Sequence, residues 1–222
     1  MMMEKIKNQL IVSCQAKDNE PLKDPTIMAK MAASALLGGA KAIRAAGVED
    51  IKAIKAFNDT LVIGLIKRNY PDSEVYITPT KVEVLKLIES GCEIIALDGT
   101  NRHRPNQETL VSLISLIHAS NRLAMADIST FEEALMAQQA GADCVSTTLS
   151  GYTSYSKQQA GPDLKLLGKC IAKLQIPVIA EGRIRNPQEL KRVLKKKPFA
   201  VVIGTAITRP SEITKTFVEC FK

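Results

Sequence analysis

The sequence predicts an α/β fold that consists of a single (β/α)8 barrel, the TIM-barrel fold. Eight short, apolar, strand-like runs alternate with segments whose apolar residues recur with helical spacing. Such alternation is typical of a parallel sheet, because parallel neighbours need a crossover connection. Eight repeats favour a closed barrel over the alternative, an open doubly wound sheet. An open sheet would be expected to carry a glycine fingerprint after its first strand, and LIVSCQAKDNEP has none.

The predicted strands are nearly continuous apolar runs, as expected for a sheet that is covered on both faces. They are Leu10–Cys14, Ala42–Arg44, Val62–Lys67, Ile94–Asp98, Leu123–Asp127, Cys144–Thr147, Val178–Glu181 and Ala200–Gly204. Helices are predicted between most of these strands, because apolar residues there recur at three- and four-residue steps. They include Thr26–Leu37, Lys81–Ser90, Glu108–Ala119, Thr130–Ala140 and Pro187–Leu194.

Signals at the helix ends agree with these bounds. Thr130 and Glu133 have the spacing of a capping box, in which each side chain caps the other's backbone amide. Pro187 and Pro210 stand where a first helical turn accepts proline, and Gly91 follows a predicted helix as a C-cap. No linker rich in Pro, Gly or Ser divides the chain, so we expect residues 1–222 to form one barrel domain.

The composition predicts a soluble protein of the cytoplasm. No apolar run approaches the roughly 20 residues that a membrane helix needs, so we expect no membrane partner. The N-terminal segment MMMEKIKNQLIVSCQ is too polar for a signal peptide. The cysteines are scattered without a CxxC pair, which favours reduced thiols and predicts no metal site. They are Cys14, Cys92, Cys144, Cys170 and Cys220.

The net charge of +7 raises the question of a nucleic-acid partner. Much of the excess lies at the end of one predicted helix, from Lys191 to Lys197, where a helix dipole favours cations. Nucleic-acid binders usually combine a basic patch with aromatic stacking residues, and this chain has no Trp, 4 Tyr and 5 Phe. We therefore expect a solvated basic surface and no nucleic-acid partner.

Polar residues follow the predicted strands at the end where a (β/α)8 barrel carries its chemistry. They are Ser13, Gln15, Arg44, Lys67, Arg68, Asp98, Asp127, Thr147, Thr148, Glu181, Gly204 and Thr205. Charges that converge in a dry cleft are costly unless they pair or meet a ligand. The number of ionisable groups favours a functional cleft over isolated structural ion pairs. No Ser-His-Asp or Cys-His arrangement supports acyl transfer.

The segments after the last two strands favour a phosphate site. Gly182 and Gly204 allow close approach to the backbone, and Arg209 can bind phosphate oxygens in bidentate fashion. Arg183 and Thr205 stand beside them and complete the predicted set. Loops after strands seven and eight often bind phosphate together with a helix N-terminus. The alternative is a common glycine turn with Arg209 as a surface cation.

Several segments together resemble the N-acylglucosamine-6-phosphate 2-epimerases, also called N-acetylmannosamine-6-phosphate 2-epimerases. They are IVSCQA, AKAIRA, IGLIKRNY, ALDGTNRHRP, MADIST, STTLSGYTSY, AEGRI and IGTAITRP, and the resemblance runs from about Leu10 to the C-terminus. LSGYTSY is the most discriminating, since barrel folding gives no reason for it. The resemblance implies interconversion of N-acetylmannosamine 6-phosphate and N-acetylglucosamine 6-phosphate, a step in sialic-acid and amino-sugar catabolism.

The resemblance assigns the catalytic roles to Lys67 and Glu181, without settling which of them performs which proton transfer. Inversion at C2, next to an aldehyde, can proceed by removal of the C2 proton and return of a proton to the opposite face. Lys67 is suited to act as a base if burial or neighbouring cations lower its pKa. From the residues alone, a structural Lys67–Glu181 ion pair is an equally good interpretation.

Five further residues are expected to bind the substrate. Gln15, Arg44 and Asp127 suit the sugar hydroxyls, the acetamido group or the enolate oxygen, and Arg44 is our choice for polarising the open-chain carbonyl. Asp127 could instead orient Lys67 or form a structural pair. Tyr152 and Thr153 lie in the loop after strand six and are expected to cover the substrate, although aromatic loop residues are as often packing.

No motif for nicotinamide, flavin or pyridoxal phosphate is present, and we expect no cofactor, because the proton transfer requires none. Alternatives are another phosphate-binding barrel enzyme, of a thiazole- or tryptophan-pathway type, and a non-catalytic sugar-phosphate-binding protein. The resemblance also suggests a homodimer, with Phe217 and Phe221 of the C-terminal helix as a contact face. Their four-residue spacing is equally typical of intramolecular core.

Overall fold

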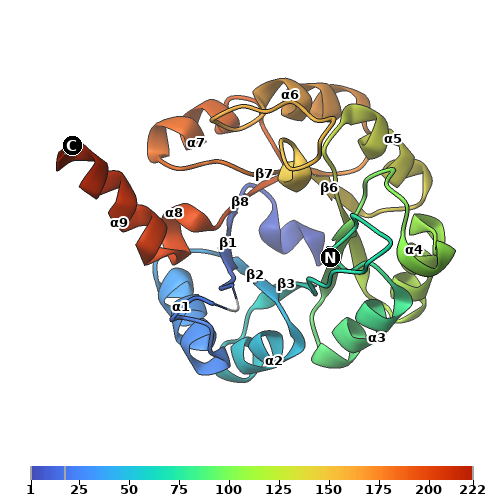
Figure 1. The fold of residues 1–222 in the computed structure, drawn as a ribbon, viewed down its shortest axis with the longest axis horizontal. Coiled ribbons are helices and arrows are strands. Elements are labelled where there is room, and N and C mark those ends of the chain that lie inside the picture. Colours follow the sequence, from blue (N-terminus) through green and yellow to red (C-terminus); the bar gives the residue numbers. More distant parts are fainter. Residues whose placement is uncertain (1, 18, 222) are drawn as a thin grey trace.

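Eight parallel strands close into a barrel in sequence order, because β8 pairs with β1 (Figure 1). The computed structural model describes residues 2–17 and 19–221. The strands are β1 (Leu10–Cys14), β2 (Ala42–Ala46), β3 (Leu61–Leu65), β4 (Ile94–Asp98), β5 (Leu123–Asp127), β6 (Cys144–Ser146), β7 (Val178–Glu181) and β8 (Ala200–Ile203). The predicted fold, a single (β/α)8 barrel, is confirmed.

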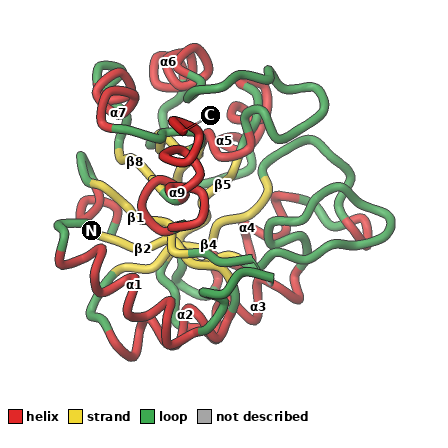
Figure 2. The backbone as a smooth tube through the Cα atoms, turned by 60° about the vertical axis from the view of Figure 1, so that its left-hand side comes forward, coloured by secondary structure: helices red, strands yellow, loops and turns green. Residues whose placement is uncertain are grey.

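Helices follow the strands and surround the barrel (Figures 1 and 2). They are α1 (Pro25–Leu37), α2 (Val48–Phe57), α3 (Lys81–Ser90), α4 (Leu110–Ala119), α5 (Phe131–Gln139), α6 (Leu164–Lys173), α7 (Pro187–Leu194), α8 (Thr205–Thr208) and α9 (Pro210–Val218). The predicted capping box of Thr130 and Glu133 starts α5, and Pro187 stands in the first turn of α7. Gly91 ends α3 in the left-handed conformation, with φ of 84°. None of the described helices has the length and apolar character needed to cross a bilayer.

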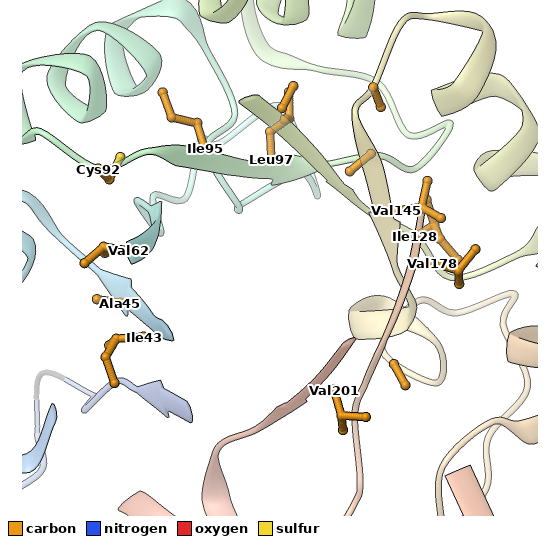
Figure 3. Close-up of a cluster of buried hydrophobic side chains, with 14 of the residues drawn as sticks. Ile43, Ala45, Val62, Cys92, Ile95, Leu97, Ile128, Val145, Val178 and Val201 are labelled. Atoms are coloured by element: carbon orange, nitrogen blue, oxygen red, sulfur yellow. The ribbon is translucent and has the colours of Figure 1, made fainter. Parts of the chain in front are cut away.

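Two apolar clusters hold the barrel together. The outer cluster lies between the strands and the surrounding helices, and Figure 3 shows part of it, including Ile43, Val145 and Val201. The inner cluster fills the barrel, where the inward-facing side chains of β1 to β8 meet. Ile6 is fully buried in this inner cluster and belongs to a short turn, η1 (Met3–Ile6). This N-terminal turn, which the sequence pattern did not predict, therefore packs into the barrel interior.

Four strand ends differ from the predicted bounds, and the smallest difference is in β8, which ends at Ile203 rather than Gly204. β3 ends at Leu65, so Lys67 lies in the following loop, where its backbone pairs with Ile77. β2 continues to Ala46, which places Arg44 inside the strand rather than at its end. β6 ends at Ser146, because the chain turns there into η3 (Thr147–Leu149).

The alternation of side chains explains what reaches the site. Ala42 and Met125 face the inner cluster, so Arg44 and Asp127, two residues further along their strands, face the same interior. Glu181 follows the inward-facing Ile179 in the same way. The inward position at the carboxyl end of several strands is thus occupied by a charged or hydroxyl side chain. This layer forms the floor of the candidate site.

Helix α9 projects from the barrel beside α8 (Figure 1). None of its described residues is buried. Phe217 is 67% exposed, and Phe221, in the turn that follows α9, is 91% exposed. The interpretation of these aromatic residues as intramolecular core is therefore wrong.

Candidate active site

The site is built around Arg44, which is fully buried at the carboxyl end of the barrel. Its Nη2 donates to Asp127 Oδ2 at 2.6 Å, and its Nη1 donates to Asp127 Oδ1 at 3.0 Å. The same Nη1 donates to Glu181 Oε2 at 2.9 Å. Strands β2, β5 and β7 thus bring one guanidinium and two carboxyl groups into direct contact.

The electrostatics of this contact keep Arg44 charged. Burial by itself disfavours the charged guanidinium, but the negative charges of Asp127 and Glu181 outweigh it, and the pKa of Arg44 rises above its ordinary value. The bidentate geometry with Asp127 is the strongest form of this pairing. Arg44 and Asp127 therefore act as a fixed, neutral unit on which the rest of the site is assembled.

Lys67 stands at the rim of the site with its side chain open to solvent. Within residues 2–17 and 19–221 it takes part in no ion pair, and the carboxyl group of Glu181 pairs with Arg44 instead. The interpretation of Lys67 and Glu181 as a structural ion pair is therefore wrong. The surrounding protein removes part of its hydration and lowers the pKa of Lys67, and the positive charge of Arg44 adds to this effect. Both effects favour the neutral amine.

Glu181 has the opposite shift. Burial raises the pKa of its carboxyl group, and the nearby charge of Asp127 acts in the same direction, while Arg44 opposes them. Thr148 Oγ1 lies 3.0 Å from Glu181 Oε2. The Thr147 hydroxyl donates to the backbone carbonyl of Glu181 at 2.8 Å and accepts from its amide at 3.1 Å. Glu181 is thus held at its side chain and its backbone, and it tends to keep its proton.

The two shifts favour one protonation state. A neutral Lys67 with a protonated Glu181 has the same total charge as the ammonium–carboxylate pair, so the surrounding Arg44–Asp127 unit stays balanced in either case. Because the pKa of Lys67 is lowered and that of Glu181 is raised, both shifts favour the neutral pair. In the neutral pair, Lys67 can accept a proton and Glu181 can donate one. General acid–base catalysis at a carbon atom uses two such groups.

The loops after β1 and β8 meet next to this cluster. Gln15 Nε2 donates to Ser13 Oγ at 2.9 Å, and the Thr208 hydroxyl donates to the Ser13 carbonyl at 2.7 Å. A Cβ on Gly204 would lie only 3.1 Å from Ser13 Cβ, so a side chain there would crowd the β1 loop. The helix that follows, α8, is a single turn, and α9 starts at Pro210, where the sequence predicts a first helical turn.

Two of the predicted phosphate ligands have protein partners. Arg209 forms an ion pair with Glu20 of the loop after β1, and its Nε has no partner among the described residues. Arg183 donates to the carbonyl groups of Ser150 and Gly161. Its guanidinium thus holds the loop after β6, and the place of Arg183 in the phosphate site stays a prediction. Gly182 has φ of 106°, and the hydroxyl of the exposed Thr205 has no hydrogen-bond partner among the described residues.

The LSGYTSY segment is mainly a brace between loops. Thr153 is 3% exposed, and its hydroxyl contacts Ser129 Oγ at 3.1 Å. The Tyr155 hydroxyl donates to Glu133 at 2.6 Å, which ties the segment to the start of α5. Thr153 therefore does not face a ligand as expected, because its polar group is used inside the protein. Tyr152 is 58% exposed and lies 5.7 Å from the guanidinium carbon of Arg183.

Steric contact with Arg183 explains why residue 151 of the same segment is glycine. Its φ is 78°, and a Cβ there would lie 2.4 Å from Arg183 Nη1. A side chain would displace the guanidinium that secures the loop. The LSGYTSY segment, which is the most discriminating part of the family resemblance, thus mainly holds the loops around the site in place.

Asp98, a weaker candidate in the sequence, is a structural residue. Its carboxylate accepts from Arg102 at 2.7 Å and from the Thr100 hydroxyl at 2.6 Å. Sequence reasoning gave no role to Ser146 or Thr148, although the alternation of β6 makes Ser146 an inward-facing residue. It also missed Tyr76, whose pKa is raised by burial and by the charges of Asp127 and Asp98. Tyr76 comes close to the site because the loop after β3 folds back, and no local signal predicts that.

Within the described part of the chain, no three His, Cys, Asp or Glu side chains gather as a metal site would require. The fold and the site define a (β/α)8-barrel protein with a lysine and a glutamate beside a buried arginine–carboxylate unit. A family profile described as "Putative N-acetylmannosamine-6-phosphate epimerase" matches residues 28–222. The chain belongs to this family.

Relatives and a solved structure agree with this assignment. A Clostridioides difficile protein named as an N-acetylmannosamine-6-phosphate 2-epimerase is 55% identical over 100% of this chain and 99% of its own length. The solved N-acetylmannosamine-6-phosphate 2-epimerase of Clostridium perfringens has a TM-score of 0.98 and 54% identity, and the match covers 99% of this chain and 96% of that one. Thiamine phosphate pyrophosphorylase of Pyrococcus furiosus, at 20% identity and a TM-score of 0.66, shares the fold alone.

The buried cluster predicts a large stability effect. Asp127→Ala leaves the buried guanidinium of Arg44 without its bidentate partner, and we expect the free energy of unfolding to fall by about 3–5 kcal/mol. Urea denaturation measures this change. As a control, Glu132→Ala removes the exposed partner of Lys169 and should cost at most about 1 kcal/mol. Equal losses in the two variants would contradict the structural role of the Arg44–Asp127 unit.

Proposed function

We propose that the protein interconverts N-acetylmannosamine 6-phosphate and N-acetylglucosamine 6-phosphate. The family assignment supports this reaction, and the observation that carries it is the buried Arg44–Asp127–Glu181 cluster, beside which the pKa values of Lys67 and Glu181 shift in opposite directions. Each group is biased toward the form that proton transfer needs. We also propose that the enzyme works in the cytoplasm, in the catabolism of sialic acid and amino sugars, and its five free cysteines suit a reducing compartment.

Epimerisation at C2 removes a proton from one face of this carbon atom and adds a proton to the opposite face. In the open-chain sugar, the C2–H bond is weakened by the adjacent aldehyde, and removal of that proton leaves an enolate. Neutral Lys67 and protonated Glu181 can serve as a proton acceptor and a proton donor in one turnover. The reverse reaction starts from the opposite protonation states, so each group has to both take and give a proton. Either residue could act first, and Glu181 could also exchange the proton at the ring oxygen during ring opening.

Arg44 is proposed to stabilise the oxygen that becomes negative. Three of its N–H groups are used on Asp127 and Glu181, and its Nε has no partner among the described residues. A guanidinium carries five N–H donors, so donors remain for a carbonyl or enolate oxygen. Asp127 fixes the guanidinium in place, and Gln15 is proposed to bind a sugar hydroxyl or the acetamido group.

The phosphate is proposed to bind at the loops after β7 and β8, near Gly182, Gly204, Thr205 and Arg209. The backbone at both glycines is open to close approach. Arg209 pairs with Glu20, so a phosphate dianion would share or replace that carboxylate as its partner. Tyr152, which is exposed beside this region, is proposed to cover the bound sugar.

The decisive assay incubates N-acetylmannosamine 6-phosphate with the protein in deuterated water. We expect formation of the C2 epimer with deuterium at C2, because the proton that returns comes from a group in exchange with solvent. Nuclear magnetic resonance of the sugar measures both events. The sugar without its phosphate is the control for the phosphate site and should react with a much lower kcat/KM.

Variants separate this proposal from its alternatives. Lys67→Ala and Glu181→Ala should each lower kcat by at least 100-fold, as expected for general acid–base groups, with little change in the free energy of unfolding for Lys67→Ala. Binding of the sugar phosphate without any turnover would favour a non-catalytic sugar-phosphate-binding protein. Turnover of a different phosphorylated substrate alone would favour another barrel enzyme.

We also propose that the chain forms a homodimer through helix α9. The helix projects from the barrel, and Phe217, Val218 and Phe221 present a row of exposed apolar side chains. Such a patch is costly in water, and a second copy of the same surface can cover it with matched apolar contacts.

Sedimentation of the purified protein tests the dimer. The wild-type chain should sediment as a dimer, and the double variant Phe217→Asp/Phe221→Asp should sediment as a monomer. Phe57→Asp, which changes an equally apolar residue that is 61% exposed on α2, should stay dimeric. A monomeric wild-type protein would contradict the proposal.

A further inference from the structure

The last residue of β6 and the two residues after it carry hydroxyl groups and contact Glu181. We name Ser146, Thr147 and Thr148 the STT segment. Thr147 holds the backbone of Glu181 through two hydrogen bonds, to its carbonyl oxygen at 2.8 Å and from its amide at 3.1 Å. The side chain of Glu181, which also accepts from Arg44, is contacted by Ser146 and Thr148. The STT segment thus contacts Glu181 at both ends of the residue.

Thr148 makes the closer side-chain contacts. Its Oγ1 lies 2.8 Å from Asp127 Oδ1, 3.0 Å from Glu181 Oε2 and 2.9 Å from Ser146 Oγ. Ser146 Oγ is 3.4 Å from Glu181 Oε2, at the outer limit of a hydrogen bond. Thr148 Oγ1 and Arg44 Nη1 therefore bridge the same two carboxyl oxygens, Asp127 Oδ1 and Glu181 Oε2.

The number of protons limits how these contacts can form. Each of the three short contacts of Thr148 Oγ1 needs one hydrogen atom between its two oxygens. The hydroxyl groups of Thr148 and Ser146 supply one each. The third contact, with Glu181 Oε2, carries a hydrogen atom when Glu181 is protonated or when Thr148 turns its own hydroxyl hydrogen to it. Asp127 accepts from two nitrogens of Arg44, which favours its ionised form, so Glu181 is the one of the two carboxyl groups that can carry a proton.

This count gives the contacts a direction. Thr148 donates to Asp127, which is its nearest acceptor and carries a full negative charge. Thr148 then offers lone pairs to Ser146 and, when Glu181 is protonated, to its carboxyl group. A valine at this position has nearly the same shape but can neither donate to Asp127 nor accept from Glu181. The Glu181 carboxyl group would then be held only by Arg44 and the long Ser146 contact, and we expect it to rotate from the position in which it meets the substrate.

We propose that Thr148 is a positioning residue, whose hydroxyl links Asp127 to the carboxyl group of Glu181 and fixes that carboxyl group for proton transfer. The expected change in kcat rests on the proposed epimerase function. The expected change in the position of the Glu181 side chain does not depend on that function.

Kinetics of three variants test the proposal. Thr148→Val should lower kcat about tenfold, the effect of losing one hydrogen bond to a charged partner, with KM nearly unchanged. Thr148→Ser keeps the hydroxyl and should restore most of kcat. Thr60→Val is the matched control, because Thr60 is buried before β3 and its hydroxyl has no partner among the described residues. This control should keep the wild-type kcat.

A double variant shows whether Thr148 acts through Glu181. Combined with Glu181→Gln, Thr148→Val should cause no further loss of kcat, because the group that it positions is already gone. A further tenfold loss would show that Thr148 acts on something else and would overturn the proposal. A wild-type kcat in Thr148→Val alone would overturn it as well.

A crystal structure of Thr148→Val separates this proposal from the proposed function. The carboxyl group of Glu181 should rotate or adopt two positions, whereas its backbone stays bonded to Thr147. This result would support the positioning role even if the wild-type protein turned over no sugar phosphate. A Glu181 carboxyl group in its wild-type position, still bonded to Arg44, would overturn the proposal even in an active epimerase.

Discussion

The contact between Arg44 and Asp127 is the interaction on which the rest of the site depends. A guanidinium this deep in a barrel loses its hydration, and only charged partners with good geometry can offset that cost. Asp127 supplies two hydrogen bonds in one plane, and the remaining N–H of Nη1 then points at Glu181. One buried cation therefore sets the positions of two carboxyl groups that would otherwise repel each other.

The Arg44–Asp127 unit also shifts the pKa values of Lys67 and Glu181 in opposite directions. Lys67 is repelled by the positive charge of Arg44 and has lost part of its hydration, and both effects lower its pKa. Glu181 is buried beside Asp127, and this raises its pKa despite the contact with Arg44. Lys67 is nevertheless open to solvent at the rim, so a substrate can reach the amine without disturbing the buried cluster. Lys67 at the rim is thus the group that solvent can reach, and the buried cluster beneath it shifts the pKa values.

Much of this arrangement follows from local sequence rules. The strand and helix alternation predicted the barrel, and the positions after the apolar runs included Arg44, Asp127 and Glu181 because alternation puts them on the inner face. Other features depend on distant contacts. The packing of Ile6 into the barrel interior, the fold-back of the loop that brings Tyr76 to the site, and the use of Thr153 and Arg183 as loop braces have no local signature. Residue type suited Arg183 to a phosphate, but its direction is set by carbonyl groups more than twenty positions away.

The central claim is that the site lowers the pKa of Lys67 and raises the pKa of Glu181, so that both groups are biased toward their neutral forms. The most direct measurement is the pH titration of the Lys67 side chain by nuclear magnetic resonance in protein with isotope-labelled lysine, with the signal assigned by its loss in Lys67→Arg. The account predicts a midpoint below the ordinary range of lysine, which moves upward when Arg44 is replaced by methionine. A midpoint at or above the ordinary value would contradict it, because Lys67 would then rest as the charged partner of an ionised Glu181.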